Sequence, residues 1–289
     1  MATLYRDFTT QEQIDAQYDT ALPVADRAAE MRHFADRSAL ARATLRCTLD
    51  VPYGPTRAET LDIFPAQAPG APVFVFIHGG YWRALSSKEF SCVALGLVRR
   101  GITVVVPDYA LCPAVAIDEI VRQMRAACAW VLRHVGEHGG DPQRVAVGGS
   151  SAGGHLAAMC LQTEWQRDYG LPQDPFRAAV MASGLYDLAP LRHSYLQPKI
   201  QLTEGTVRRC SPVLHVRPCA TPVLLTWGGL EQAEFARQSL AWRDAWCGAG
   251  NRAELLEQPR AHHFSAIHGF EEPDSPMCDW LAAALHEVG

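Results

Sequence analysis

Gly149-Ser150-Ser151-Ala152-Gly153 lies between a short apolar run, 144–148, and a helix-compatible segment that begins at Ala152. The pattern is G-x-S-x-G, and a position between a strand and a helix is the context in which it builds a sharp turn. Small residues are needed there because a bulky neighbour would clash with the crowded backbone. The sequence therefore predicts that Ser151 stands at a tight strand-to-helix turn, near a helix N-terminus.

Continuous apolar runs recur on both sides of this turn, and they suit strands that are covered on both faces. The runs are 73–77, 102–106, 145–147, 178–181 and 223–227. Helix-compatible stretches fill the gaps at 89–100, 117–135, 152–162 and 231–247, and a last strand and helix are expected at 253–257 and 277–288. This alternation is typical of an α/β fold with a mostly parallel central sheet flanked by helices.

Two segments stand outside the alternation. Residues 1–45 are charged and helical, with apolar positions too loosely spaced for one continuous helix, and we expect them to pack over the core as an arm or partial lid. Residues 186–216 are rich in Pro, Gly and Arg and are longer than a normal connector, so we expect a cover over the site. The two β-rich runs 47–51 and 59–64 predict an antiparallel opening hairpin. The length of 289 residues fits one domain, 1–289.

Composition limits the classes of partner. The formal net charge is -5, which provides no basic surface for nucleic acid or anionic lipid. The first residues lack the pattern of a secretory signal, so we expect a cytoplasmic protein with a small-molecule substrate and no membrane partner. A homodimer is the candidate assembly. The nine cysteines are scattered without metal-ligand spacing, and no cofactor, metal or disulfide framework is expected.

A second glycine-containing motif, His78-Gly79-Gly80, follows the predicted strand 73–77. The backbone N–H groups of Gly79, Gly80 and Ala152 are candidates for an oxyanion hole at this edge of the sheet. The alternative for this motif is a plain turn after the strand. The serine turn at 149–153 could instead be a tight connector or a phosphate-binding loop, but no lysine follows its glycines. Ser150 is the alternative nucleophile, although it would break the motif.

The base and the acid should follow Ser151 in the chain, because this turn is associated with the order serine, acid, histidine. His262 and His263 both follow the last predicted strand, and either imidazole could accept the serine proton. Glu231 is the first carboxylate after the strand 223–227, and Glu234 and Asp187 are alternatives. Glu231 could instead favour the dipole of a helix N-terminus.

These motifs together resemble the serine-type kynurenine formamidases, or arylformamidases, among α/β hydrolases, and their bacterial relatives. The particular mark is His78-Gly-Gly-Tyr-Trp82. The supporting marks are Pro52-Tyr-Gly54, Leu61-Asp-Ile-Phe64, Asp108-Tyr109, Ser183-Gly-Leu-Tyr-Asp187, Glu234-Phe235, Arg237-Gln-Ser239 and His263-Phe264. The resemblance spans most of the chain and implies an α/β-hydrolase fold.

The resemblance also implies roles for individual residues. It selects His263, which precedes a phenylalanine, as the base, and Glu231 as the acid, where the family usually has aspartate. The implied reaction is hydrolysis of an aryl formamide such as N-formyl-L-kynurenine by Ser151, giving formate and an aromatic amine without a cofactor. Tyr81 and Trp82, together with Tyr186, are candidate substrate-binding aromatic residues, although they could equally be core residues.

Three other interpretations remain open at this point. The same residues would serve a carboxylesterase for small acyl or aryl esters, and a hydrolase fold can also act as a non-catalytic small-molecule-binding protein. A metal hydrolase built on His155, His262 and His263 lacks further ligand spacing. The cations available for a substrate carboxylate are Arg83, Arg192 and Arg208, each of which could equally be a solvated surface charge.

Overall fold

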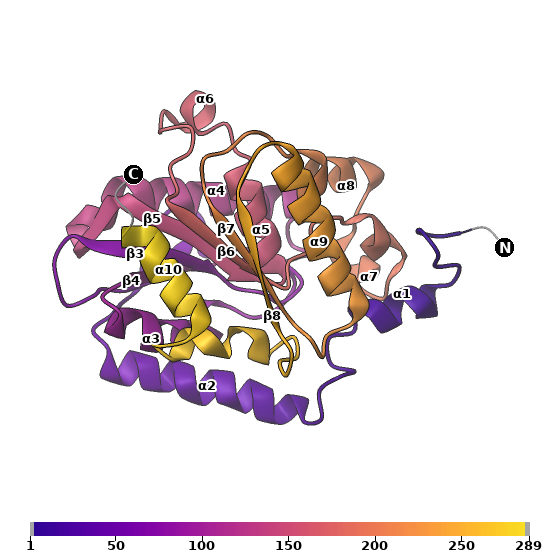
Figure 1. Ribbon diagram of the computed structural model, residues 1–289, viewed down its shortest axis with the longest axis horizontal. Helices are drawn as coiled ribbons and strands as arrows, with labels where there is room; N and C mark the ends of the chain where they lie inside the picture. Colours follow the sequence, from indigo (N-terminus) through magenta and orange to yellow (C-terminus); the bar gives the residue numbers. More distant parts are fainter. Residues whose placement is uncertain (1–2, 287–289) are drawn as a thin grey trace.

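A computed structural model describes residues 3–286 and contains one eight-stranded sheet (Figure 1). The strand order is β1-β2-β4-β3-β5-β6-β7-β8. The strands are β1 Thr48–Pro52, β2 Thr60–Phe64, β3 Ala71–Ile77, β4 Thr103–Pro107, β5 Gly140–Ser150, β6 Ala178–Ala182, β7 Val223–Gly228 and β8 Ala253–Gln258. The pairs β1–β2 and β2–β4 are antiparallel and the others are parallel, which confirms the opening hairpin and the mostly parallel sheet.

Ten α-helices and six 3-10 helices connect the strands within the described residues. The α-helices are α1 Gln11–Tyr18, α2 Arg27–Thr44, α3 Ala94–Arg99, α4 Ile117–His134, α5 Ala152–Leu161, α6 Trp165–Tyr169, α7 Gln197–Ile200, α8 Glu204–Cys210, α9 Ala233–Gly248 and α10 Pro276–His286. The 3-10 helices are η1 Ser87–Glu89, η2 Ser91–Val93, η3 Val135–His138, η4 Ala189–His193, η5 Pro212–Leu214 and η6 Ser265–Glu271. No helix among residues 3–286 combines the length and apolarity needed to cross a bilayer.

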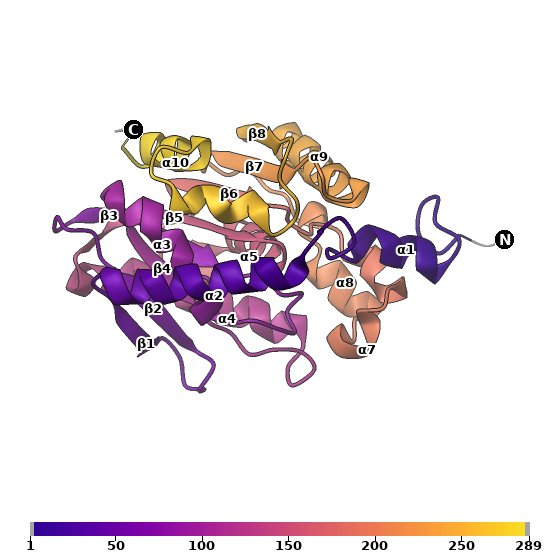
Figure 2. The ribbon, with the colours of Figure 1, turned by 90° about the horizontal axis from the view of Figure 1, so that it is seen from below.

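The sheet is buried on both faces, which explains the uninterrupted apolar runs. Along β3, Val73 and Val75 belong to one apolar cluster, whereas Phe74 and Phe76 belong to the other, because successive side chains point to opposite faces. The first cluster includes residues of α4, α5 and α9, and the second includes residues of α2, α3, η6 and α10. Figure 2 shows α2, α3 and α10 gathered on one side of the sheet.

Two predicted helices differ in their bounds. The helix expected over 89–100 is two 3-10 helices followed by a short α3, because Ser86 and Glu89 form a capping box that begins η1 at Ser87. The helix expected from residue 231 begins at Ala233, so Glu231 lies in the loop after β7. The predicted end of the last helix, 287–288, falls outside the described residues.

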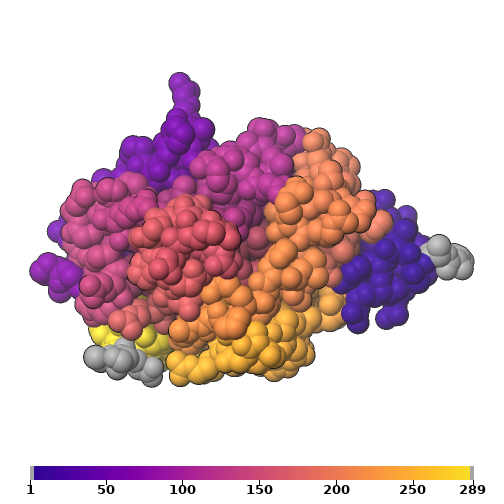
Figure 3. Space-filling view, turned by 90° about the horizontal axis from the view of Figure 1, so that it is seen from above, coloured from indigo at the N-terminus to yellow at the C-terminus, as the bar shows by residue number. Residues whose placement is uncertain are grey.

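The N-terminal segment divides into two helices that lie in different places. α2 runs beside α3 and η6, whereas α1 lies at one end of the molecule, near α9 (Figures 1 and 2). Figure 3 shows the part of the chain around α1 (indigo) forming that end of the surface. Buried hydrogen bonds join α1 to α9, since the Tyr18 hydroxyl donates to Glu234 over 2.7 Å and accepts from the Gln238 amide over 2.9 Å.

Candidate active site

Ser151 occupies the turn between β5 and α5 in a backbone conformation that residues other than glycine rarely adopt. Its φ is 58° and its ψ is -119°. A Cβ on Gly153 would lie 1.9 Å from the carbonyl oxygen of Ile77, and one on Gly149 would lie 2.4 Å from that same oxygen. The two glycines of the motif are therefore required because the turn packs directly against the end of β3.

A buried histidine and glutamate form a pair near this turn. His263 Nδ1 lies 2.6 Å from Glu231 Oε2, and the two side chains are 7% and 1% exposed. The bond from Nδ1 to the carboxylate leaves Nε2 as the nitrogen that can exchange a proton with another group. The structure therefore brings together the histidine and the carboxylate that the resemblance selects.

Glu231 is held by its second oxygen as well. Oε1 accepts a hydrogen bond from the Ser183 hydroxyl over 2.6 Å and one from the Gly228 N–H over 2.6 Å. Ser183 follows β6, is fully buried and has a φ of 50°. Reasoning from residue types missed this contact, although Ser183 begins one of the segments that mark the resemblance.

The other candidate carboxylates have different partners. Glu234 accepts hydrogen bonds from Tyr18 and, over 2.5 Å, from Arg237 Nε, and Asp187 accepts one from the Tyr5 hydroxyl over 2.8 Å. Both carboxylates therefore connect the N-terminal segment to the core. Neither is bonded to a histidine.

A cavity of about 40 Å³ is lined by residues of both glycine motifs and by His263. The polar part of its lining consists of Gly79, Gly80, Ser150, Ser151 and His263. The apolar part consists of Met31, Phe34, Leu85, Phe90, Phe264 and Ile267. Ser151 is 4% exposed and His263 is 7% exposed, so both side chains are buried where they meet this cavity.

Gly79 and Gly80 border the same space, and Ala152 follows Ser151 directly. A Cβ on Gly79 would lie 3.3 Å from the Ser151 Cβ, so only a glycine lets this loop approach the serine without displacing it. Gly80 has a φ of 107°, and a Cβ there would lie 2.0 Å from the Ala84 carbonyl oxygen. Ala152 is the first residue of α5, where the backbone N–H has no acceptor within the helix.

The loop that carries these glycines is anchored through His78. The His78 ring stacks on Tyr109 with centroids 4.2 Å apart, and its Nε2 lies 3.1 Å from Asp108 Oδ1. The Tyr109 hydroxyl donates to the His78 carbonyl oxygen over 2.9 Å. This explains why Asp108-Tyr109 accompanies the glycine motif, since both residues hold its position.

The three aromatic candidates pack away from the cavity. Trp82 is fully buried, and its indole N–H donates to His155 Nδ1 over 3.2 Å. The Tyr81 hydroxyl donates to the Tyr18 carbonyl oxygen over 2.6 Å, and Tyr186 stacks in the core on Trp242. None of the three is among the residues that line the cavity, so their contact with a substrate stays a prediction.

The three arginine candidates are also absent from the cavity lining. Arg83 and Arg192 are exposed, and Arg208 forms an ion pair with Glu204 over 2.6 Å on the surface. Their contact with a substrate carboxylate stays a prediction.

The histidines of the metal-hydrolase alternative do not converge. Burial lowers the pKa of His155 to about 4, and its Nε2 lies 2.7 Å from the Cys210 carbonyl oxygen. His262 Nε2 lies 3.4 Å from Glu30 Oε1, and His263 is engaged by Glu231.

Within the described residues, the donor atoms of His33, His268 and Glu271 lie within 4.8 Å of one another, which is the spacing of a metal site. The imidazole rings of His33 and His268 stack with centroids 4.1 Å apart, so their in-plane lone pairs do not point toward a common centre. Glu271 is already bonded to His33 and Arg37. The arrangement fits a contact between helices better than an ion site.

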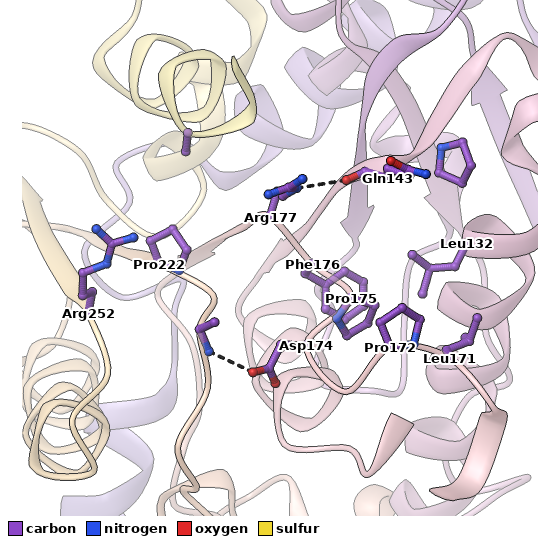
Figure 4. A pocket seen from close by; sticks show the side chains of 13 residues that line it. Leu132, Gln143, Leu171, Pro172, Asp174, Pro175, Phe176, Arg177, Pro222 and Arg252 are labelled. Carbon is purple, nitrogen blue, oxygen red and sulfur yellow. Dashed lines mark hydrogen bonds between the residues drawn. The ribbon is translucent and has the colours of Figure 1, made fainter. Parts of the chain in front are cut away.

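A larger cavity of about 580 Å³ lies elsewhere (Figure 4). Its lining includes Arg177, Pro222 and Arg252, which precede β6, β7 and β8, and Figure 4 shows the Arg177 side chain bonded to the Gln143 carbonyl oxygen. This is the edge where parallel strands begin, whereas ligand sites of α/β sheets gather where the strands end. The large cavity is therefore separate from Ser151.

A mostly parallel sheet with a serine at the β5–α5 turn and a histidine–carboxylate pair at the same edge defines an α/β hydrolase. Residues 74–214 match the family model described as the alpha/beta hydrolase fold. The chain is 31% identical to kynurenine formamidase from Danio rerio, with 78% of each chain covered, and 30% identical to that from Salmo salar, with 83% of each covered. The chain belongs to the kynurenine formamidase family of α/β hydrolases, and it is an enzyme rather than a non-catalytic binding protein.

Esterases are also among the relatives. Esterase LipQ of Mycobacterium tuberculosis is 29% identical over 75% of this chain and 56% of its own length. A Silicibacter crystal structure, assigned as a thioesterase candidate, is 27% identical with a TM-score of 0.83 and covers 95% of this chain and 99% of that chain. Esterase LipW of Mycobacterium marinum, at 24% identity and a TM-score of 0.71 over 95% of this chain and 93% of that chain, shares the fold.

Proposed function

We propose that the enzyme hydrolyses an aryl formamide such as N-formyl-L-kynurenine to formate and the aromatic amine. The observation that carries the proposal is the cavity that Ser151 and His263 share with the two glycines, together with the kynurenine formamidases among the relatives. A nucleophile, a base and backbone donors at one small apolar space are what acyl transfer from a small carbonyl group requires.

In the proposed mechanism the Ser151 hydroxyl oxygen attacks the formyl carbon while its proton passes to His263 Nε2. The negative charge that develops on the carbonyl oxygen is stabilised by the N–H groups of Gly79, Gly80 and Ala152, each worth about 3 kcal/mol by comparison with single-donor deletions in such sites. His263 then donates the proton to the aniline nitrogen as the carbon–nitrogen bond breaks. Glu231 stabilises the intermediate imidazolium and keeps the imidazole oriented.

The second half of the reaction regenerates the serine. Water gives a proton to His263 Nε2 and attacks the formyl ester on Ser151. The tetrahedral intermediate collapses, the proton returns to the serine oxygen, and formate leaves. The formyl carbon is never oxidised or reduced, so the cycle needs only the substrate and water.

A carboxylesterase is the second candidate, because an esterase is 29% identical to the chain. The same residues would perform acyl transfer from an ester, which has a better leaving group than an anilide. The two candidates differ in the substrate that the rest of the site recognises, and not in the roles of Ser151, His263 and Glu231.

Steady-state kinetics on two substrates separates the candidates. We would measure kcat/KM for N-formyl-L-kynurenine and for p-nitrophenyl acetate with the wild type, Ser151→Ala and Ser150→Ala. The proposal expects the formamide to be much the better substrate, and Ser151→Ala to lower both values by at least about 1,000-fold. Ser150→Ala should retain most of both. Turnover of the ester alone would favour the esterase, and activity that survives Ser151→Ala would refute the mechanism.

A further inference from the structure

Helix α2 supplies a wall of the cavity that contains Ser151. Met31 and Phe34 of α2 line the same space of about 40 Å³ as Gly79, Ser151 and His263. An apolar cavity of about 150 Å³ is enough to bind benzene, so a space of about 40 Å³ is small. The N-terminal segment therefore limits the room beside the nucleophile.

The wall is anchored to both loops that frame the site. Toward the glycine motif, the Ser38 hydroxyl donates to the Glu89 carbonyl oxygen over 2.8 Å, and Arg42 donates to the Lys88 carbonyl oxygen over 2.6 Å. Because Lys88 and Glu89 belong to η1, these bonds fix α2 to the segment that follows Gly80 and Leu85.

Toward the histidine loop, α2 is anchored by a charged cluster. Arg37 Nε donates to Glu271 Oε2 over 2.5 Å, and His33 Nε2 lies 2.8 Å from Glu271 Oε1. The Glu271 side chain is 4% exposed. Glu271 is the last residue of η6, and η6 begins two residues after His263. The helix thus spans the site from one loop to the other.

Phe34 has little room to move within this frame. It is 4% exposed, its ring centroid lies 5.4 Å from that of Phe90, and it lies 5.6 Å from that of His268. Phe90 lines the same cavity. Phe34 is therefore held by neighbouring aromatic rings as well as by the anchoring of its helix.

We propose that Met31 and Phe34 are specificity-determining residues that restrict the acyl group transferred to Ser151 to one or two carbons. The proposal rests on the proposed function, because it takes Ser151 as the nucleophile. Once the carbonyl carbon is bonded to Ser151 and its oxygen faces the amides of the glycine loop, we place the remaining acyl substituent in this cavity, against Met31 and Phe34. A formyl hydrogen or an acetyl methyl fits, whereas a longer chain would displace the α2 wall.

This restriction distinguishes a formamidase from a general esterase. The discrimination acts on the acyl side, so it applies to formamides and to esters alike. Each methylene that an apolar pocket cannot accommodate changes kcat/KM by roughly 10-fold to 200-fold. The wild type should therefore hydrolyse p-nitrophenyl acetate at least about 100-fold better than p-nitrophenyl butyrate, which has two more methylenes.

The test is the ratio of kcat/KM for p-nitrophenyl butyrate to that for p-nitrophenyl acetate. Phe34→Ala and Met31→Ala should raise this ratio at least about tenfold by enlarging the cavity. Phe34→Leu is a milder variant that keeps an apolar contact with the core. The matched control is Leu40→Ala, on the same helix with a side chain that is 42% exposed, and it should leave the ratio unchanged.

The possible results distinguish a failure of this proposal from a failure of the proposed function. If Phe34→Leu and Met31→Ala are folded by circular dichroism and the ratio does not change in either, the proposal is wrong. If the variants instead change the preference among leaving groups and leave the preference among acyl groups constant, then the amine, and not the acyl group, lies against α2. That result would also overturn the proposal. If ester hydrolysis persists in Ser151→Ala, the proposed function itself fails, whatever the ratio shows.

Discussion

At the scale of single residues, the carboxylate of Glu231 is fixed on both of its oxygens. One oxygen faces His263 at 2.6 Å, and the other accepts from Ser183 and from the Gly228 N–H, each also at 2.6 Å. Glutamate reaches farther than the aspartate that is usual at this position in the resembled family. The three bonds show how the longer side chain is held without freedom to rotate, so the substitution preserves the orientation of the imidazole.

We expect Glu231→Asp to lower kcat by about 10-fold to 100-fold even though it introduces the residue usual in the family. The shorter side chain cannot reach His263 while it keeps both bonds on its other oxygen. Glu231→Gln should lose more, about 1,000-fold to 10,000-fold, because the amide cannot stabilise the imidazolium. Steady-state kinetics on the preferred substrate measures both. Equal activity of Glu231→Asp and the wild type would show that the three-bond arrangement is not needed.

Ser183 acts through Glu231 and is a positioning residue. Ser183→Ala removes one of the two donors on Oε1 and should lower kcat by about tenfold with KM nearly constant, because the loss affects the base and not substrate binding. Combined with Glu231→Gln, the change should have almost no further effect on kcat, which a merely structural role would not explain. Additive losses in the double variant would contradict the assignment.

At the scale of elements, a small number of buried polar contacts hold α2 in its position. Glu271 is buried and accepts from both Arg37 and His33, so Glu271→Gln should lower the free energy of unfolding by about 1–3 kcal/mol. Urea titration followed by circular dichroism measures this change. Arg32→Ala is the control on the same helix, because the ion pair of Arg32 with Asp26 spans 3.6 Å between side chains that are 65% and 60% exposed. A loss in the control as large as that in Glu271→Gln would contradict the importance of the buried contact.

Elements with continuous apolar sequences were predictable from the sequence, and the placement of α2 was not. β3 and β4 are buried on both faces, so their residues leave little choice of structure. Met31 and Phe34 are ordinary apolar positions in a polar helix, and nothing local shows that they meet Phe90 and Ile267. That contact depends on tertiary packing between segments far apart in the chain.

The residues of the site likewise divide into those that a local sequence pattern identifies and those that it does not. Ser151 was identified because a sharp turn leaves a local pattern of small residues, and His263 was selected by its neighbour Phe264 in the resembled family. Ser183 carries no such pattern, because a serine after a strand is compatible with many roles. Trp82 was a candidate for the substrate pocket, and the sequence could not show that its indole would be directed at His155.

At the scale of the whole molecule, two histidines whose pKa is lowered by the fold couple stability to pH. Burial lowers the pKa of His155 from 6.5 to about 4, and Trp82 donates to its Nδ1, which only the neutral ring can accept. Burial, with smaller contributions from His33, His262 and Arg37, likewise lowers the pKa of His268 to about 4. In the unfolded chain both rings would protonate near the ordinary pKa, so the unfolded state takes up protons first as the pH falls.

The stability from these rings should be complete above about pH 6.5 and be lost as the pH falls toward 4. For His155 alone the loss is on the order of 3 kcal/mol. Urea titrations between pH 4 and pH 7 measure it, and His155→Gln should show a flatter dependence than the wild type, because one of the two rings with a lowered pKa has been removed. An identical pH dependence in His155→Gln would show that this ring does not carry the effect.

The central claim is that an aryl formamide reacts at Ser151, and active-site labelling tests it most directly. We would treat the wild type with an alkyl fluorophosphonate, identify the labelled peptide by mass spectrometry, and repeat the reaction with increasing N-formyl-L-kynurenine. The account predicts one label, on Ser151, formed more slowly as the formamide concentration rises through its KM. A label on another residue, or labelling of Ser151 at an unchanged rate while the formamide is being hydrolysed, would contradict it.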